Sequence, residues 1–180
     1  MKRIVLRSLL MTAAPLLFSA LASAQSNTGT TTLSVTVGPE ASLTVTTGTT
    51  SLATAGTVFN AFTGITNYNV KMRSTVTGGG GTLTLKVTTD FAGAGGPSVL
   101  APPTAGDLLT YTCAAVTSGT PCTGPLTAST TTATSVATFG TNAHSAAAGD
   151  GSSVSWSLVN DPQYKTGTYT ATVTLTVSAT

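Results

Sequence analysis

The sequence has very few residues that carry charge or chemistry. Its 180 residues include seven Lys or Arg, five Asp or Glu, one histidine, one tryptophan and two cysteines. A single histidine cannot anchor a typical zinc site. The abundant residues are instead Thr, Val, Ser, Ala and Gly, and a composition rich in β-branched residues and poor in charge is not that of a disordered chain. These shortages favour a folded, non-catalytic protein without a metal or cofactor.

The first 24 residues predict a removable signal peptide. Lys2, Arg3 and Arg7 are followed by a short apolar stretch, and Ala-Ser-Ala at 22–24 forms a small-x-small cleavage site. The alternative is an uncleaved membrane anchor, although the apolar stretch is short and interrupted for a spanning helix. Residues 25–180 contain no second stretch long enough to span. We therefore expect an exported protein of the periplasm, the cell surface or the extracellular space.

Removal of residues 1–24 changes the charge balance. Four basic and five acidic residues remain, a formal net charge of −1. No basic patch is left to neutralise phosphates, so nucleic acid is not an expected partner. A neutral surface rich in hydroxyls suits packed assemblies, and it suits secreted monomers too.

Alternation of apolar and polar residues predicts short β-strands along most of residues 25–180. The clearest segments are 65–73, 82–87, 153–158 and 169–177, and Gly, Pro, Ser, Asn and Asp separate the segments. We expect a single domain over 25–180, an antiparallel immunoglobulin-like β-sandwich of about seven to nine strands, with a closed barrel as the alternative. Gly78–Gly81 is expected to form a hairpin connection, and residues 91–106 a long surface loop.

The remaining motifs have a structural and a functional interpretation. Cys113 and Cys122 predict a disulfide across a short turn-rich segment, with a redox or metal pair as the alternative. Trp156 is expected in the core rather than as a platform for stacking sugars. A hydrolase could combine His144 and Asp150 with a serine, but no nucleophile-elbow pattern supports it. Calcium could bind near Asp107, Asp150 or Asp161, but these acids read more simply as parts of turns. No catalytic, metal or cofactor residue is assigned.

The carboxyl-terminal segment carries a family resemblance. Gly167 is fourteenth from the end, and alternating apolar residues follow it. This segment resembles the last strand of chaperone–usher pilus subunits and of spore-coat-U-like secreted proteins. Two features depart from that pattern: Ala179 stands where pilus subunits usually carry an aromatic residue, and Cys113 and Cys122 lie late and close together. The resemblance covers residues 167–180 and implies a surface subunit that associates with itself or with another secreted protein.

The amino-terminal segment 25–39 fits that hypothesis as an arm. Residues 31–37 alternate like a strand and end at Gly38-Pro39. In the resembled pili such an arm completes the sheet of a neighbouring subunit. The simpler interpretation is that the segment pairs within its own domain, because Pro39 is also ordinary at an edge strand. The residues expected to take part in assembly are Leu33, Val35 and Val37 in the arm, and Val173, Leu175 and Val177 near the carboxyl terminus.

A second class of function, a secreted module that binds a carbohydrate or a surface, is the alternative. Its signature would be exposed aromatic side chains on one face or loop, and the candidates are Tyr68, Tyr111 and Tyr164.

Overall fold

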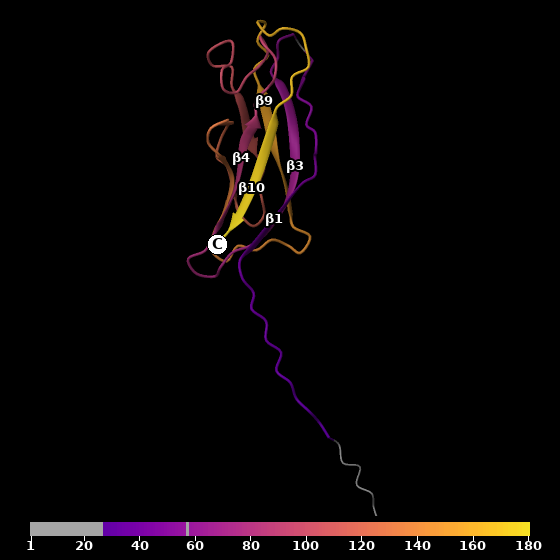
Figure 1. Ribbon diagram of the computed structural model, residues 1–180, viewed down its shortest axis with the longest axis vertical. Coiled ribbons are helices and arrows are strands. Elements are labelled where there is room, and N and C mark those ends of the chain that lie inside the picture. The colour runs from indigo at the N-terminus through magenta and orange to yellow at the C-terminus, as the bar shows by residue number, and fades with distance from the viewer. Residues whose placement is uncertain (1–26, 57) are drawn as a thin grey trace, which may run out of the picture. The chain divides into compact units, whose positions relative to one another are not determined.

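The computed structural model describes residues 27–56 and 58–180, and the expected signal peptide lies outside them. The described residues contain strands and no helix, which confirms the all-β prediction (Figure 1). The folded unit spans Thr36–Thr180. The described residues form ten strands, against the seven to nine expected, and three of the ten are only two residues long. They are β1 Glu40–Val45, β2 Ala53–Thr54, β3 Phe62–Arg73, β4 Gly81–Thr89, β5 Leu109–Cys113, β6 Thr120–Pro121, β7 Leu126–Thr127, β8 Thr134–Phe139, β9 Asp150–Leu158 and β10 Thr172–Ala179.

The strands form two antiparallel sheets that pack against each other. The first sheet has the order β1-β3-β9-β5-β7, with β2 also paired to β3, and the second has the order β10-β4-β8-β6. Both sheets have free edges, so the domain is a β-sandwich and not a closed barrel. The hairpin expected at Gly78–Gly81 is wrong: β3 and β4 lie in different sheets, and residues 74–80 cross from one sheet to the other.

Alternate residues of the long strands meet between the sheets and form the core. Trp156 of β9 is 6% exposed, which confirms its expected place in the core, and its ring centroid lies 5.6 Å from that of Tyr111. Its indole N–H donates to the hydroxyl of Thr66 at 2.8 Å. A buried tryptophan needs such an acceptor, because an unpaired buried donor destabilises the fold.

The predicted disulfide between Cys113 and Cys122 is present and joins the two sheets. Cys113 ends β5 in the first sheet. Cys122 follows β6, and its backbone N–H donates to the carbonyl of Val136 in β8, a strand of the second sheet. The cross-link therefore fixes the sandwich on the side opposite β1 and β10, the edge strands that begin the two sheet orders.

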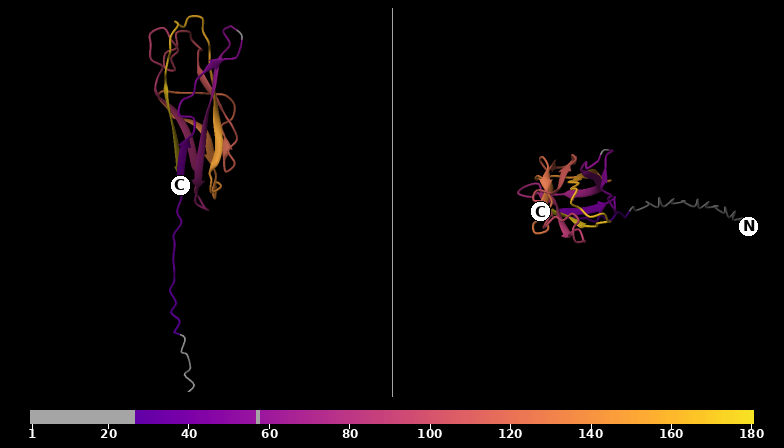
Figure 2. Two further views of the ribbon diagram at one scale, coloured as in Figure 1. Left: turned by 90° about the vertical axis from the view of Figure 1, so that its right-hand side faces the viewer. Right: turned by 90° about the horizontal axis from the view of Figure 1, so that it is seen from above.

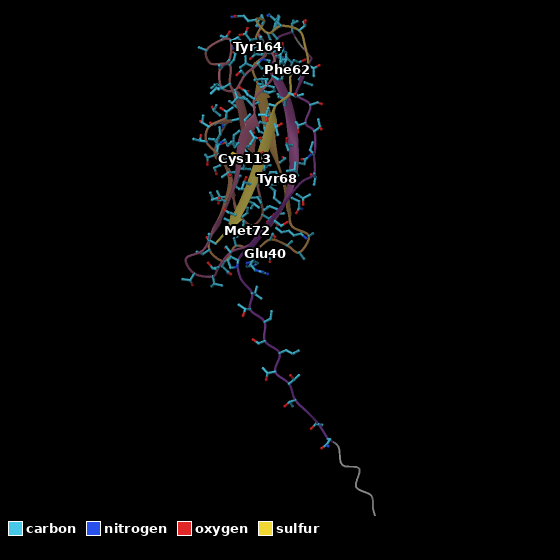
Figure 3. The ribbon with its side chains drawn as sticks, viewed as in Figure 1. Glu40, Phe62, Tyr68, Met72, Cys113 and Tyr164 are labelled. Atoms are coloured by element: carbon cyan, nitrogen blue, oxygen red, sulfur yellow. A yellow bond between two sulfur atoms is a disulfide. The ribbon has the colours of Figure 1, made fainter. Side chains whose placement is uncertain are left out.

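The two ends of the sandwich differ. We call the end that carries Glu40, Arg73, Gly81 and Ala179 the base: these residues are joined by strand pairing and by the β3–β4 connection. The opposite end is the apex, where the β2–β3, β4–β5 and β9–β10 connections lie (Figure 2). Side-chain positions show the same division, with Glu40 and Met72 at the base and Phe62 and Tyr164 at the apex (Figure 3).

Candidate assembly site

Strand β10 forms one edge of the second sheet, and its inward apolar side chains are only half-buried. Leu175 of β10 lies opposite Leu85 of β4, and paired residues point to the same face of a sheet. Leu85 is fully buried, whereas Leu175 is half-buried. The same contrast recurs along the strand in the pairs Val173–Val87 and Val177–Leu83. The inward apolar side chains of β10 therefore have a paired strand on one side only.

The free edge of the first sheet is uncovered in the same way. Leu43 of β1 is half-buried opposite the fully buried Val70 of β3. Val45 is 40% exposed although its partner Tyr68 is buried. Strands β1 and β10 contact each other on the same side of the sandwich (Figure 1). We call this side, made of β1 and β10, the open edge.

Strand β10 of the open edge lacks the devices that usually block strand pairing. Charged residues, prolines and mid-strand bulges protect exposed edges from other chains. Residues 173–179 of β10 contain no charge and no proline, and the register shift lies at the start of the strand, between Thr172 and Val173. The eight residues Thr172–Ala179 thus offer a nearly regular backbone template.

The outward face of β10 is covered by hydroxyls. Its Thr and Ser residues alternate with the apolar ones, and some bond to hydroxyls of β4: Ser178 to Thr82 at 3.0 Å and Thr174 to Thr88 at 3.1 Å. These bonds make the outward face of β10 polar, and Lys86 of β4 lies opposite Thr174 on the same face. Only the inward face can therefore gain from covering by another apolar side chain.

The carboxyl terminus holds β10 in place at the base. The carbonyl of Thr180 accepts hydrogen bonds from the backbone N–H groups of Thr75 and Gly80, both at 3.1 Å, and the N–H of Thr180 donates to the carbonyl of Gly80 at 2.8 Å. A Cβ atom at Gly79 would collide with the hydroxyl of Thr75 and the carbonyl of Thr180. Glycine at position 79 thus permits the close approach that fixes the end of β10.

The segment expected to be a strand before Gly38 is not one. Residues 27–39 contain no strand, and Leu33, Val35 and Val37 are 92%, 85% and 63% exposed. The edge with which residues 31–37 pair, in their own domain or in a neighbour, stays a prediction. A segment this short cannot hold a strand conformation without a partner edge. It presents three exposed apolar side chains at alternate positions.

His144 and Asp150, the residues considered for a hydrolase, have different hydrogen-bond partners. His144 is exposed, and its Nδ1 lies 2.7 Å from the carbonyl oxygen of Asn142. The Asp150 carboxylate instead accepts hydrogen bonds from the backbone N–H and the hydroxyl of Ser118. Each side chain thus has its own local partner.

Asp107, Asp150 and Asp161, the acids considered for calcium, do not all lie at one place. Asp107 and Asp161 lie together at the apex, where the Tyr164 hydroxyl donates to Asp107 at 3.0 Å and the Gln163 N–H donates to Asp161 at 2.7 Å. Burial, with the neighbouring Asp161 carboxyl, raises the pKa of Asp107, and the Thr104 hydroxyl lowers the pKa of Asp161. Asp150 is not with them. Among residues 27–56 and 58–180, no three His, Cys, Asp or Glu side chains gather as a metal site would need.

Two of the three tyrosines proposed for ligand stacking are unavailable. Tyr68 and Tyr111 are 2% and 1% exposed, and burial raises the pKa of both. Tyr164 is half-buried and bonded to Asp107. Stacking on a sugar needs an open ring face, which Tyr68 and Tyr111 do not present.

Sequence reasoning missed part of the open edge. It selected Val173, Leu175 and Val177, which do lie along β10, but not Ala41 and Leu43 on the facing strand β1. The alternation around Leu43 was visible in the sequence, but its position at a free edge was not.

The described part of the chain has no helix long and apolar enough to cross a membrane. No family model matches the chain, and no curated protein or solved structure is significantly similar to it.

Proposed function

We propose that this protein is an exported, non-catalytic structural subunit of a surface assembly. Residues 31–37 of one copy pair with the free edge of β10 in the next copy. The observation that carries the proposal is the burial contrast between Leu175 and Leu85, opposed residues of which only the inner one is covered. A strand added at the open edge covers the outer one.

The arm and the edge match in length and in pattern. Seven residues alternate in the arm, and eight form β10. Every strand pair of the described domain is antiparallel, and antiparallel pairing is the more stable kind. In an antiparallel register that opposes Val35 to Leu175, Val37 meets Val173 and Leu33 meets Val177. Apolar side chains then point inward together.

The outward residues fit the same register. Thr36, Ser34 and Thr32 fall opposite Thr174, Thr176 and Ser178, so the added strand continues the hydroxyl-covered face. The stabilisation comes from backbone hydrogen bonds and from burial of three apolar side chains, each contributing about 1.5–3 kcal/mol before ordering costs. Little charge repulsion opposes the approach of two copies.

Export is part of the proposal. The Cys113–Cys122 disulfide is typical of an oxidising compartment, and the sequence of residues 1–24 has the features of a signal peptide. We place the assembly in the periplasm, on the cell surface or outside the cell, and we assign the sandwich to the immunoglobulin-like type. The partner is a second copy of this chain.

The test compares oxidised residues 25–180 with a truncation that begins at Glu40. Light scattering gives the size of each, and electron microscopy shows filaments. The longer form should assemble, and the truncation should remain monomeric because it has no donor segment. The truncation keeps its own β10 edge, so adding it to the longer form should shorten the assemblies by capping. Monomers of both forms would refute the proposal.

A further inference from the structure

The antiparallel register that opposes Val35 to Leu175 determines which ends of two copies meet. The inference drawn from it rests on the proposed function. Only Gly38 and Pro39 separate Val37 from Glu40, the first residue of β1. The three Cα–Cα steps from Val37 to Glu40 span at most about 11 Å. Val37 of the donor lies at Val173 of the acceptor, the apical end of β10. The base of the donor must therefore rest against the apex of the acceptor.

The apex carries an apolar tip that the domain does not cover. Val58 and Phe59, in the β2–β3 connection, are 88% and 60% exposed. Phe59 has a left-handed backbone conformation, with φ of 59°. This conformation is unfavourable for a bulky side chain, and such strain concentrates at functional positions. On a surface dominated by hydroxyls, this pair is a marked apolar projection.

The base carries a hollow of about 380 Å³. Its apolar wall includes Pro39 and Val76, and Val76 is 74% exposed. Arg73 forms a second wall and is held in position: its Nε donates to the carbonyl of Gly38 at 2.8 Å, and its Nη2 donates to Glu40 at 2.9 Å. A fixed guanidinium plane is a good partner for an aromatic ring.

The tip and the hollow lie at opposite ends of the same sheet. The tip precedes Phe62, where β3 begins, and the hollow adjoins Arg73, where β3 ends. A head-to-tail contact uses two different surfaces of the same chain and repeats from copy to copy. We infer that the Val58–Phe59 tip of each copy seats in the hollow beside Val76 and Arg73 of the next copy. This second contact fixes the angle between neighbours that a two-residue linker alone leaves free.

The test is cross-linking in the mature chain, whose two native cysteines are already paired. Copies with Phe59→Cys are mixed with copies with Val76→Cys under mild oxidation. Disulfide-linked dimers should form. A matched mixture of Phe59→Cys with Thr132→Cys, an exposed residue of the β7–β8 turn, should give none. Separately, Phe59→Ser should raise the concentration needed for assembly about tenfold or more, because an aromatic contact is lost.

Two variants separate this inference from the proposed function. Val35→Asp removes an apolar contact of the arm and should abolish assembly. Suppose that Val35→Asp abolishes assembly, Phe59→Ser assembles like the unmodified protein, and the Phe59/Val76 mixture gives no dimer. Then strand exchange stands and the tip-in-hollow contact is wrong. If Val35→Asp assembles normally, the proposed function fails, and this inference fails with it.

Discussion

Leu175 lies directly opposite Leu85 in the β10–β4 pair, yet Leu85 is fully buried and Leu175 is half-buried. The two residues have the same side chain, face and pairing, so only their position in the sheet separates them. Leu85 has a strand on both sides, whereas Leu175 has one side free. The difference in burial between Leu85 and Leu175 indicates how much of the Leu175 side chain one added strand would cover.

Assembly should depend on the apolar side chains of the arm. Val35→Asp places a charge where an apolar contact is needed, so we expect loss of assembly by light scattering. Ile65→Asp is a matched control, because Ile65 is also apolar, β-branched and exposed, at 54%, but lies on the outward face of β3. Ile65→Asp should assemble normally. Equal effects of the two substitutions would indicate a general response to charge.

Stability at acid pH should depend on Asp90. Its carboxylate accepts hydrogen bonds from the backbone N–H groups of Phe91, Val99 and Leu100 and from the hydroxyl of Ser98, at 2.7–3.0 Å, and so closes the loop after β4. Burial by itself would raise the pKa of Asp90, but these four hydrogen bonds outweigh it and hold the pKa below its ordinary value.

A carboxyl group with a lowered pKa in the folded state stabilises the fold above its unfolded pKa of about 3.9, and this contribution is lost as the pH falls through the folded value. We therefore expect Asp90→Asn to reduce the free energy of unfolding by about 1–2 kcal/mol at pH 7. The difference from the unmodified protein should shrink as the pH falls below the unfolded pKa. Glu40→Gln, which removes an exposed ion pair with Arg73, should cost little at either pH. A cost for Asp90→Asn that is independent of pH would contradict this account.

The disulfide should stabilise the domain without taking part in assembly. It joins β5 to the segment after β6, away from the open edge. Replacing Cys113 and Cys122 by alanine should lower the free energy of unfolding by about 2–3 kcal/mol, measured by urea denaturation. At temperatures where this variant remains folded, it should assemble to the same size as the oxidised protein. Loss of assembly by a folded variant would place the cross-link in the assembly site.

The fixed end of β10 should depend on glycine at position 79. Gly79→Ala forces its Cβ against Thr75 and Thr180, so we expect a loss of about 1–3 kcal/mol in thermal or urea unfolding. Gly140→Ala is the matched control, because a Cβ there meets no atom within 4 Å. If both variants have the stability of the unmodified protein, the close packing around Thr180 does not stabilise the domain.

Sequence patterns predicted the strands better than their partners. The alternation at Tyr68, Val70 and Met72 correctly placed a buried face, because a period of two follows from strand geometry. The same period at residues 31–37 predicted a strand that the domain does not contain. Periodicity shows that a segment can form a strand, but the partner depends on long-range topology. For the same reason, the crossing of residues 74–80 between sheets was mistaken for a hairpin.

The candidate site was only half predictable. Val173, Leu175 and Val177 were selected by their alternation, but Leu83, Leu85 and Val87 alternate just as clearly and are covered on both sides. The strand Thr134–Phe139 was not predicted, because Val136 and Ala137 are both buried next to a register shift, which breaks the alternation. Which strand is an edge becomes visible only when the sheet order is known.

The most direct test of strand exchange is a cross-link that reports both the partner and the direction of the added strand. Copies with Val37→Cys alone are mixed with copies with Val173→Cys alone, so that a mixed disulfide can form only between chains. An arm that pairs with its own β10 would instead run parallel to it and bring Val37 near Ala179, since β1 begins and β10 ends at the base. A chain with both Val37→Cys and Ala179→Cys tests that alternative. Our account predicts disulfide-linked dimers from the Val37/Val173 mixture and no internal cross-link in the Val37/Ala179 chain. An internal cross-link in that chain, without dimers from the mixture, would contradict it.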